Sequence, residues 1–228
     1  MEKKKKTEKE TPPKPRKTLS GPLRDKSRTM ARMVAAVGKV IQKKSYPGLT
    51  APNIATAAGV DKKLVWTYFG GVNKLIEEYI HQKDFWRLAE KGDVEALLKN
   101  PNQIGPNEIG NLLESQFEVL LKDKALQKII HWELGENSKL LRSLADERER
   151  VGEQLFSLIM SDFEKSPVDL RARLALILGG IYYLSLHSKS NGSLVCGIDV
   201  NEKSGKQRIE NAIREIIFEA YEKAGVKK

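Results

Sequence analysis

The sequence predicts an all-α protein with a small N-terminal helix-turn-helix unit and a larger C-terminal helical region. Apolar residues recur at three- and four-residue spacing through most of the chain, which is the period of one helix face. Proline, glycine and short polar residues separate these periodic stretches and mark helix ends. Only Ser193–Val200 has a strand-like composition, and because glycines flank it we expect a linker that is locally extended.

The composition indicates a folded chain whose positive charge lies at one end. The chain has 228 residues and is 40% hydrophobic, enough for the core of one large domain or two small ones. Residues 1–28 carry eleven Lys and Arg against four Asp and Glu, and residues 29–70 carry six against one. The remaining 158 residues carry 23 against 25. Such a one-ended positive field suits nucleic acid or an anionic membrane surface.

Cysteine content and apolar run lengths bear on the compartment. The one cysteine, Cys196, excludes an intramolecular disulfide and fits a reducing cytosol. The charged N-terminus is not followed by an apolar stretch, unlike a secretory signal. The longest apolar run, Leu174–Leu186, has 13 residues, whereas a bilayer span needs about 20. We therefore expect a soluble, cytoplasmic protein without a membrane partner.

Residues 1–25 predict a disordered basic arm, because they combine lysine runs, four prolines and very few apolar residues. Two interpretations of this arm remain open. It serves as a solubilising tail, or it lies along a nucleic-acid backbone or in a groove.

The next segment, 26–71, predicts a three-helix domain. An apolar stripe indicates a helix from Lys26 to about Lys44, and the sequence Tyr46-Pro47-Gly48 stops it. Two short helices follow, over Ala51–Ala58 and Lys62–Phe69. Their boundaries rest on local signals, since Thr50 and Asp61 are N-cap types, Gly59 suits a left-handed C-terminal cap, and Gly70-Gly71 break the second helix.

Residues 72–228 predict a second, helical region. Its first helix, Val72–Glu90, leaves no flexible linker after the N-terminal domain and is expected to couple the two mechanically. Asp123, Asn137 and Pro167 are expected to mark helix starts. The further helices are expected near Val94–Lys99, Glu108–Lys122, Ala125–Leu134, Ser138–Glu164, Val168–Lys189 and Glu202–Ala224.

The two short helices joined by a glycine turn have the form of a helix-turn-helix. Ala55 allows a close crossing, and Val60 and Val65 are expected to face the core. The side chains left to face outward are Lys62, Lys63, Trp66 and Thr67, with Leu64 at the margin. An exposed face of lysine and tryptophan is typical of a helix that enters the major groove of DNA. Ordinary helical bundles also contain such pairs, so that alternative stays open.

Residues 28–80, about a quarter of the chain, resemble the N-terminal domain of the TetR family of transcriptional regulators. The resemblance is carried by Tyr46, Thr50, Ile54-Ala55, Ala58-Gly59-Val60, Tyr68-Phe69 and Leu75. Ser45 stands where the family has glycine. The resemblance implies an all-helical ligand-binding and dimerisation domain in the remainder of the chain.

The resemblance also implies DNA contacts, residue by residue. Thr50 and Trp66 would contact phosphates, with Trp66 in place of the family's usual tyrosine. Tyr68 would bind a phosphate or support the helix. Lys63 and Leu64 depart from the family's usual small residue and threonine. Gly71-Val72 replace the usual Ser-Lys, so Lys74 or the basic arm would compensate. The residues expected to approach bases or the adjacent backbone are Lys62, Lys63, Leu64 and Thr67.

The last two helices predict a dimer interface. Val168–Lys189 is apolar on nearly all sides, and the final helix carries an apolar stripe. Paired with their symmetry mates they would form a four-helix interface, with packing inside one chain as the alternative. A dimer would read a pseudo-palindromic operator with half-sites one helical turn, or a multiple of it, apart.

Aromatic and histidine side chains in the C-terminal region are candidates for a pocket that binds a small apolar effector. The family implies such a pocket, and ordinary core packing is the alternative for each residue. An effector would favour one helix arrangement and change the spacing of the recognition helices. The candidates are Trp86, Phe117, His131, Trp132, Phe156, Tyr182, Tyr183 and His187.

The sequence favours a DNA-binding regulator over an enzyme. The three histidines lack metal-ligand spacing, and phosphate-loop, GxSxG and HExxH patterns are absent, so no metal or cofactor is expected. We predict a ligand-responsive repressor that acts as a homodimer on double-stranded DNA. The alternative is a helical scaffold or membrane-surface protein that uses its basic arm.

Overall fold

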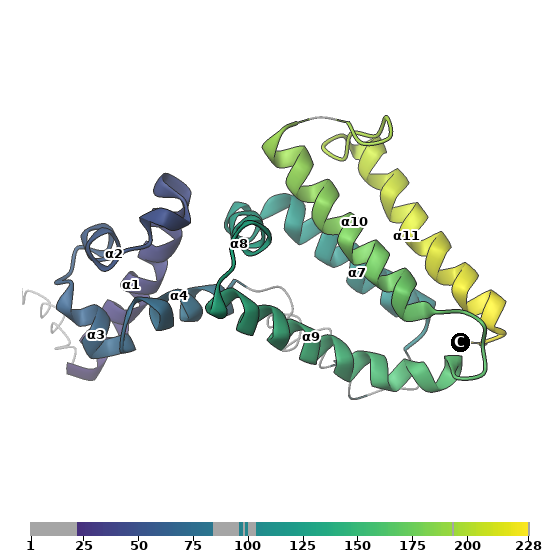
Figure 1. Ribbon diagram of the computed structural model, residues 1–228, viewed down its shortest axis with the longest axis horizontal. Coiled ribbons are helices and arrows are strands. Elements are labelled where there is room, and N and C mark those ends of the chain that lie inside the picture. Colours follow the sequence, from purple (N-terminus) through teal and green to yellow (C-terminus); the bar gives the residue numbers. More distant parts are fainter. Residues whose placement is uncertain (1–21, 84–95, 98, 100–103, 193, 228) are drawn as a thin grey trace, which may run out of the picture.

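The computed structural model describes residues 22–83, 96, 97, 99, 104–192 and 194–227. Within these residues all regular elements are helices, apart from an isolated bridge between Val195 and Ile198 (Figure 1). The predicted all-α class is confirmed. Residues 1–21 of the predicted basic arm lie outside the described residues. The prediction of disorder is wrong for residues 22–25, because helix α1 begins at Pro22 rather than at Lys26.

One end of the elongated molecule is a group of short helices around one long helix, which we call the head (Figure 1). The long helix α1 crosses α2 and α4, and α3 packs on α4. The head comprises α1 (Pro22–Lys44), the 3-10 turn η1 (Tyr46–Gly48), α2 (Ala51–Ala58), α3 (Lys63–Phe69) and α4 (Val72–His81).

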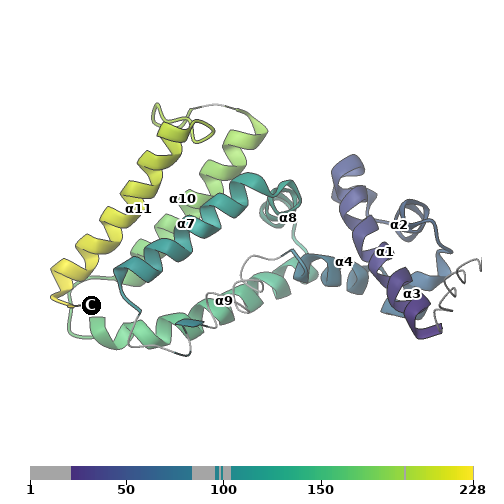
Figure 2. The same cartoon turned by 180° about the vertical axis from the view of Figure 1, so that it is seen from behind.

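The other end, which we call the body, is built from longer helices. Helices α7, α10 and α11 lie side by side in both views, and α9 runs along the molecule towards the head (Figures 1 and 2). Helix α8 lies between head and body and packs on α1. The body comprises α7 (Pro106–Lys122), α8 (Lys124–Gly135), α9 (Lys139–Ile159), η3 (Met160–Phe163), α10 (Leu170–Ser190) and α11 (Lys203–Ala224).

Several predicted helix ends need correction. The predicted helix Val72–Glu90 ends at His81, and a turn follows at 82–83. The sequence has no proline or glycine there, so no local signal marks this end; residues 84–90 lie outside the described residues. Helix α10 is capped by Asp169 rather than Pro167, because the Asp169 carboxylate accepts a 2.9 Å hydrogen bond from the Ala172 amide. Similarly, the N-cap residue of α9 is Ser138 rather than Asn137.

The apolar core of the head continues into the body. Buried side chains from α1, α2, α3 and α4 pack in one cluster with Ala125 and Ile129 of α8 and with Leu141 and Leu144 of α9. A second cluster fills the space between α7, α10 and α11, around the fully buried Phe117. Since one core spans both parts, a rearrangement of α8 or α9 is physically linked to the head.

Helices α1 and α4 approach each other closely at a glycine. A Cβ atom placed on Gly38 would lie 2.7 Å from the Tyr79 hydroxyl oxygen, so only glycine fits against this buried ring. Burial raises the pKa of Tyr79 to about 12. The position of α4 against α1 is therefore set by backbone-to-ring contact.

Ser45 is in a backbone conformation that favours glycine. Its φ is 55° and its ψ is −170°, at the junction between α1 and η1. This is the position at which the TetR pattern has glycine, and a side chain there is strained by about 1–3 kcal/mol. The tight turn after α1 is thus kept despite the serine.

Replacing Ser45 by glycine should stabilise the protein by about 1 kcal/mol, because relief of strain exceeds the added entropy of the unfolded chain. Chemical denaturation of Ser45→Gly measures this. Ser143→Gly, at an exposed position inside α9, is the control and should destabilise by about 0.5 kcal/mol. A loss of stability in Ser45→Gly would contradict the strain.

Candidate nucleic-acid interface

The turn between α2 and α3 is fixed by local hydrogen bonds. The Thr50 hydroxyl accepts from the Asn53 amide at 3.4 Å, as its predicted capping role requires. Gly59 has a φ of 63°, which confirms the left-handed cap, and the Val60 amide donates to the Ala55 carbonyl at 3.1 Å. These bonds determine where α3 starts and in which direction it runs.

Arg32 reinforces this turn from α1. Its guanidinium donates to the carbonyl of Ala58 at 2.6 Å and to that of Gly59 at 3.0 Å. This role of Arg32 is not predictable from the sequence, because only the tertiary fold brings α1 beside the end of α2. Arg32 satisfies carbonyls that the end of α2 leaves without helical partners.

Helix α3 is held by one buried side chain and its two ends. The helix begins at Lys63 with Lys62 as its N-cap, one residue later than predicted, although the Asp61 carboxylate still accepts from the Lys63 amide at 2.8 Å. Gly70, with a φ of 74°, ends the helix as predicted. Val65 is fully buried in the head core. With Val65 inward, the opposite side of this two-turn helix must face solvent.

The outward side of α3 carries the side chains that the sequence analysis placed there. We call Lys62, Lys63, Trp66 and Thr67 the α3 face; all four are exposed, and Trp66 is 54% exposed. Leu64 and Tyr68 flank the face and are half-buried. The Thr67 hydroxyl donates to the Lys63 carbonyl at 3.1 Å. An exposed tryptophan between lysines is a surface suited to a polyanion.

Further positive charge surrounds the α3 face. The Lys26 ammonium lies 5.5 Å from the centre of the Tyr68 ring, which brings the start of α1 beside α3. Lys74 is exposed in the first turn of α4, a turn without acidic residues. The first amides of α4 add the partial positive charge of a helix N-terminus. Together these groups extend the positive surface beyond α3.

The aromatic and histidine residues predicted to line one effector pocket lie in separate places. Phe156 borders a small apolar cavity of about 50 Å³ between α7, α9 and α10. Phe117 is fully buried, and the Tyr182 hydroxyl accepts a 3.0 Å hydrogen bond from the buried Gln116 amide. The burial of Gln116 is not predictable from the sequence, because a polar side chain usually faces solvent.

The other candidates lie away from that cavity. His131 and Trp132 line a cleft between head and body. Tyr183 and His187 stack on each other on α10, with ring centres 5.3 Å apart, and Tyr183 is exposed. Trp86 lies outside the described residues. The candidates therefore do not share one cavity.

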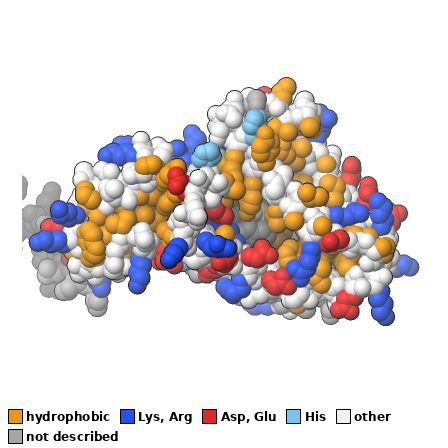
Figure 3. Space-filling model, viewed as in Figure 1, with side chains coloured by type: hydrophobic (Ala, Val, Ile, Leu, Met, Phe, Trp, Pro, Cys, Tyr) orange, Lys and Arg blue, Asp and Glu red, His pale blue; other side chains and the backbone are white. Residues whose placement is uncertain are grey.

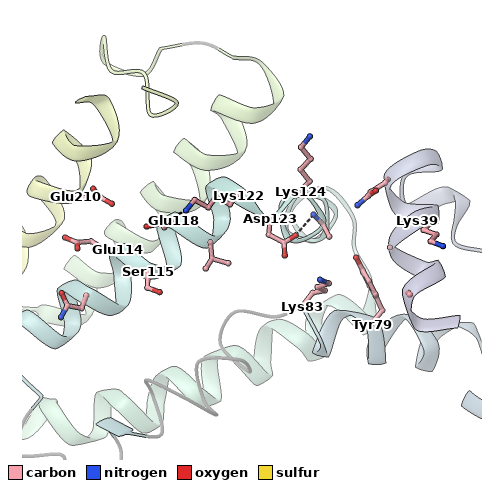
Figure 4. Close-up of a pocket in the computed structure, with 16 residues that line it drawn as sticks. Lys39, Tyr79, Lys83, Glu114, Ser115, Glu118, Lys122, Asp123, Lys124 and Glu210 are labelled. Atoms are coloured by element: carbon pink, nitrogen blue, oxygen red, sulfur yellow. Dashed lines mark hydrogen bonds and ion pairs between the residues drawn. The ribbon is translucent and has the colours of Figure 1, made fainter. Parts of the chain in front are cut away.

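An open groove also separates head and body on the other side of α8. It has a volume of about 1040 Å³. Figure 4 shows Lys39 and Tyr79 of the head on one wall, with Glu114, Ser115 and Glu118 of α7 opposite. We call it the mixed groove, because lysine and acidic side chains both line it.

Solved structures with the same architecture come from transcriptional regulators. A TetR family transcription regulator of Marinobacter aquaeolei has a TM-score of 0.59 at 12% identity, over 87% of this chain and 97% of that one. FadR of Bacillus subtilis, solved with stearoyl-CoA, has a TM-score of 0.59 at 16% identity, over 82% and 96%. NalD, the secondary repressor of the MexAB-OprM multidrug efflux pump in Pseudomonas aeruginosa, has a TM-score of 0.58 at 18% identity, over 86% and 96%.

The chain therefore has a TetR-like fold from head to body. No protein-family model and no curated protein matches its sequence. In the described part of the chain, no helix is both long enough and apolar enough to cross a membrane. Within the same residues, no group of three or more His, Cys, Asp or Glu side chains is placed to hold a metal ion.

Trp66→Ala should leave the free energy of unfolding within about 0.5 kcal/mol of the wild-type value, because the side chain is exposed. Val65→Ala, one residue away, should cost about 2 kcal/mol, since it removes buried methyl groups. Chemical denaturation of both variants measures the difference. Equal destabilisation would mean that Trp66 serves the fold rather than a partner.

Proposed function

We propose that the protein is a DNA-binding transcriptional regulator whose helix α3 enters the major groove of duplex DNA. One observation carries the proposal: α3 turns Val65 into the core and leaves a lysine- and tryptophan-bearing face exposed. Structural relatives that are regulators support the proposal at the level of fold. A helix of this kind at the end of a positively charged head suits insertion into a groove.

The geometry suggests a division of roles on the surface. Lys62 and Lys63 at the start of α3, with Thr67 one turn on, would approach base edges or the adjacent backbone, and Leu64 would lie at the margin. Phosphates would be contacted by side chains of α3 and of the neighbouring helix starts, namely Trp66, Tyr68, Thr50 and Lys74. Phosphate contacts position the protein, and base contacts select the sequence.

We further propose that the protein acts as a homodimer through α10 and α11. Leu176 of α10 is 78% exposed and Tyr183, two turns on, is 58% exposed. Gly179 between them has nothing within 4 Å of a Cβ placed on it, so a second backbone has room to approach. Figure 3 shows hydrophobic side chains gathered on the side where α10 faces the viewer. An exposed apolar patch of this kind indicates a protein interface.

An apolar effector would bind in the body. The cavity beside Phe156 is bordered by apolar side chains and by Gly152, but its volume of about 50 Å³ is far below that of a typical ligand pocket. Binding there would push α9 away from α7 and α10. Because Leu141 and Leu144 of α9 belong to the head core, such a shift would move the head.

Binding to duplex DNA should depend strongly on salt. If about six phosphates are contacted, affinity should fall about a thousandfold between about 50 and about 200 mM salt. Trp66→Ala should weaken all duplexes alike, whereas Lys62→Ala or Thr67→Ala should change base preference at one position by about 1–3 kcal/mol. Fluorescence anisotropy with labelled duplexes measures both effects.

Lys165→Ala is the control for this experiment, because Lys165 is exposed in the body, away from α3. It should leave base preference unchanged. Binding that hardly responds to salt, or a Lys62→Ala variant with wild-type preference, would contradict insertion of α3.

A charge on the outer face of α10 should break the dimer. Leu176→Arg would place an unpaired cation in an apolar interface and should give a monomer in sedimentation equilibrium. Leu134→Arg is the matched control, since Leu134 of α8 is 69% exposed and does not belong to α10 or α11. A wild-type monomer at micromolar concentration, or a dimeric Leu176→Arg variant, would overturn the proposed interface.

A further inference from the structure

A second cleft opens between head and body, on the side of α8 that carries His131 and Trp132. Its volume is about 660 Å³, within the usual range for small-molecule sites of about 300–1,000 Å³. The head contributes the end of α1 and η1, and the body contributes α8 and the C-terminal ends of α7 and α10. We call it the lysine cleft.

Cations from three helices converge on the lysine cleft, and none of its lining residues is acidic. Lys124, Lys128 and His131 recur at four- and three-residue spacing along one face of α8. The ends of the neighbouring helices add two further lysines, Lys122 of α7 and Lys189 of α10. Five basic side chains around one space favour an anion over a neutral molecule or a cation.

Most of this charge is not neutralised by the protein. Lys122 pairs with Glu118, and the Lys189 ammonium lies 2.5 Å from the Asn201 side-chain oxygen, which is uncharged. Lys124 and Lys128 are exposed, and no ion pair joins either of them to any residue that the structure describes. Lysines brought together in this way repel each other, so an anion between them would relieve that repulsion.

The cleft also has an apolar, aromatic wall. The rings of Tyr46 and Trp132 stack with centres 5.5 Å apart and planes 2° from parallel. The Tyr46 hydroxyl donates to Glu136 at 2.7 Å, and this bond raises the pKa of Tyr46 because ionisation would lose it. Ile41 and Leu186 line the cleft as well. A bound anion would therefore also bring an apolar or aromatic body.

The mixed groove offers a contrast. It shares Lys122 and Lys124 with the lysine cleft, but Glu114, Glu118, Asp123 and Glu210 also line it. Figure 4 shows these carboxylates among the lysines, and its dashed lines mark interactions between residues of the groove. Because both signs of charge are present there, the mixed groove has no comparable preference for an anion.

We propose that the lysine cleft binds a small amphiphilic anion, with a carboxylate, sulfonate or phosphate group on an aromatic or aliphatic body. This site is separate from the apolar cavity beside Phe156. Its occupant would touch the head at Tyr46 and Ile41 and the body at Lys128 and Lys189. A ligand that bridges the two parts would hold the head at one angle to the body, so it would act as a second regulatory input.

The test compares two dyes that differ in charge. The probe 8-anilinonaphthalene-1-sulfonate is an aromatic anion, and N-phenyl-1-naphthylamine is its neutral counterpart without the sulfonate. Each is titrated into the full-length wild-type protein and into Lys124→Glu/Lys128→Glu. The control variant Lys139→Glu/Lys165→Glu makes the same change in net charge at exposed positions outside the cleft. DNA is not needed, so the result does not depend on the proposed regulator function.

The anionic dye should bind the wild type saturably and the Lys124→Glu/Lys128→Glu variant about tenfold more weakly, since two attractive charges become repulsive. The control variant should keep wild-type affinity, and the neutral dye should bind all three proteins alike. The proposal is overturned by an absence of saturable anionic-dye binding, by equal loss in both variants, or by equal loss for both dyes. It is also overturned if the Lys124→Glu/Lys128→Glu variant keeps wild-type affinity for the anionic dye.

Discussion

The structure depends on the apolar core that α1, α2, α3 and α4 share with α8 and the first half of α9. Val65 anchors α3 to this core from one side, and Leu141 and Leu144 join it from the body. Close packing transmits displacement rather than absorbing it, so the orientation of α3 and the arrangement of the body are linked through one set of contacts. The exposed α3 face and the clefts on either side of α8 are consequences of how the helices meet around this core.

Positive charge is distributed unevenly between the two ends of the molecule. The first 70 residues hold all of the excess positive charge, whereas the remainder is slightly negative. A polyanion would therefore approach the head first, where α3 and the N-terminus of α4 are exposed. The lysine cleft between head and body is a second basic site, since none of the residues that line it is acidic. Duplex DNA and a small anion would thus be drawn to different ends of α1.

Local chemistry explains what the sequence could predict. Thr50, Gly59, Asp61 and Gly70 fix the helix-turn-helix through bonds and backbone angles within a few residues, so their roles were predictable from neighbouring positions. The end of α4 at His81 has no such signal. Likewise, Arg32 and the stack of Tyr46 on Trp132 depend on contacts between distant segments. The aromatic candidates lie in separate places because of how each helix is rotated about its own axis. The spacing of apolar residues does not predict that rotation for a nearly all-apolar helix such as α10.

The central claim is that α3 reads the sequence of duplex DNA as one of two symmetry-related probes. Selection of bound duplexes from a random pool tests it most directly, with the full-length protein at moderate salt. Two symmetry-related α3 helices should enrich an inverted repeat whose two halves are separated by one helical turn or a multiple of it. Recovery of duplexes without any shared sequence, at an affinity that matches the unselected pool, would contradict it.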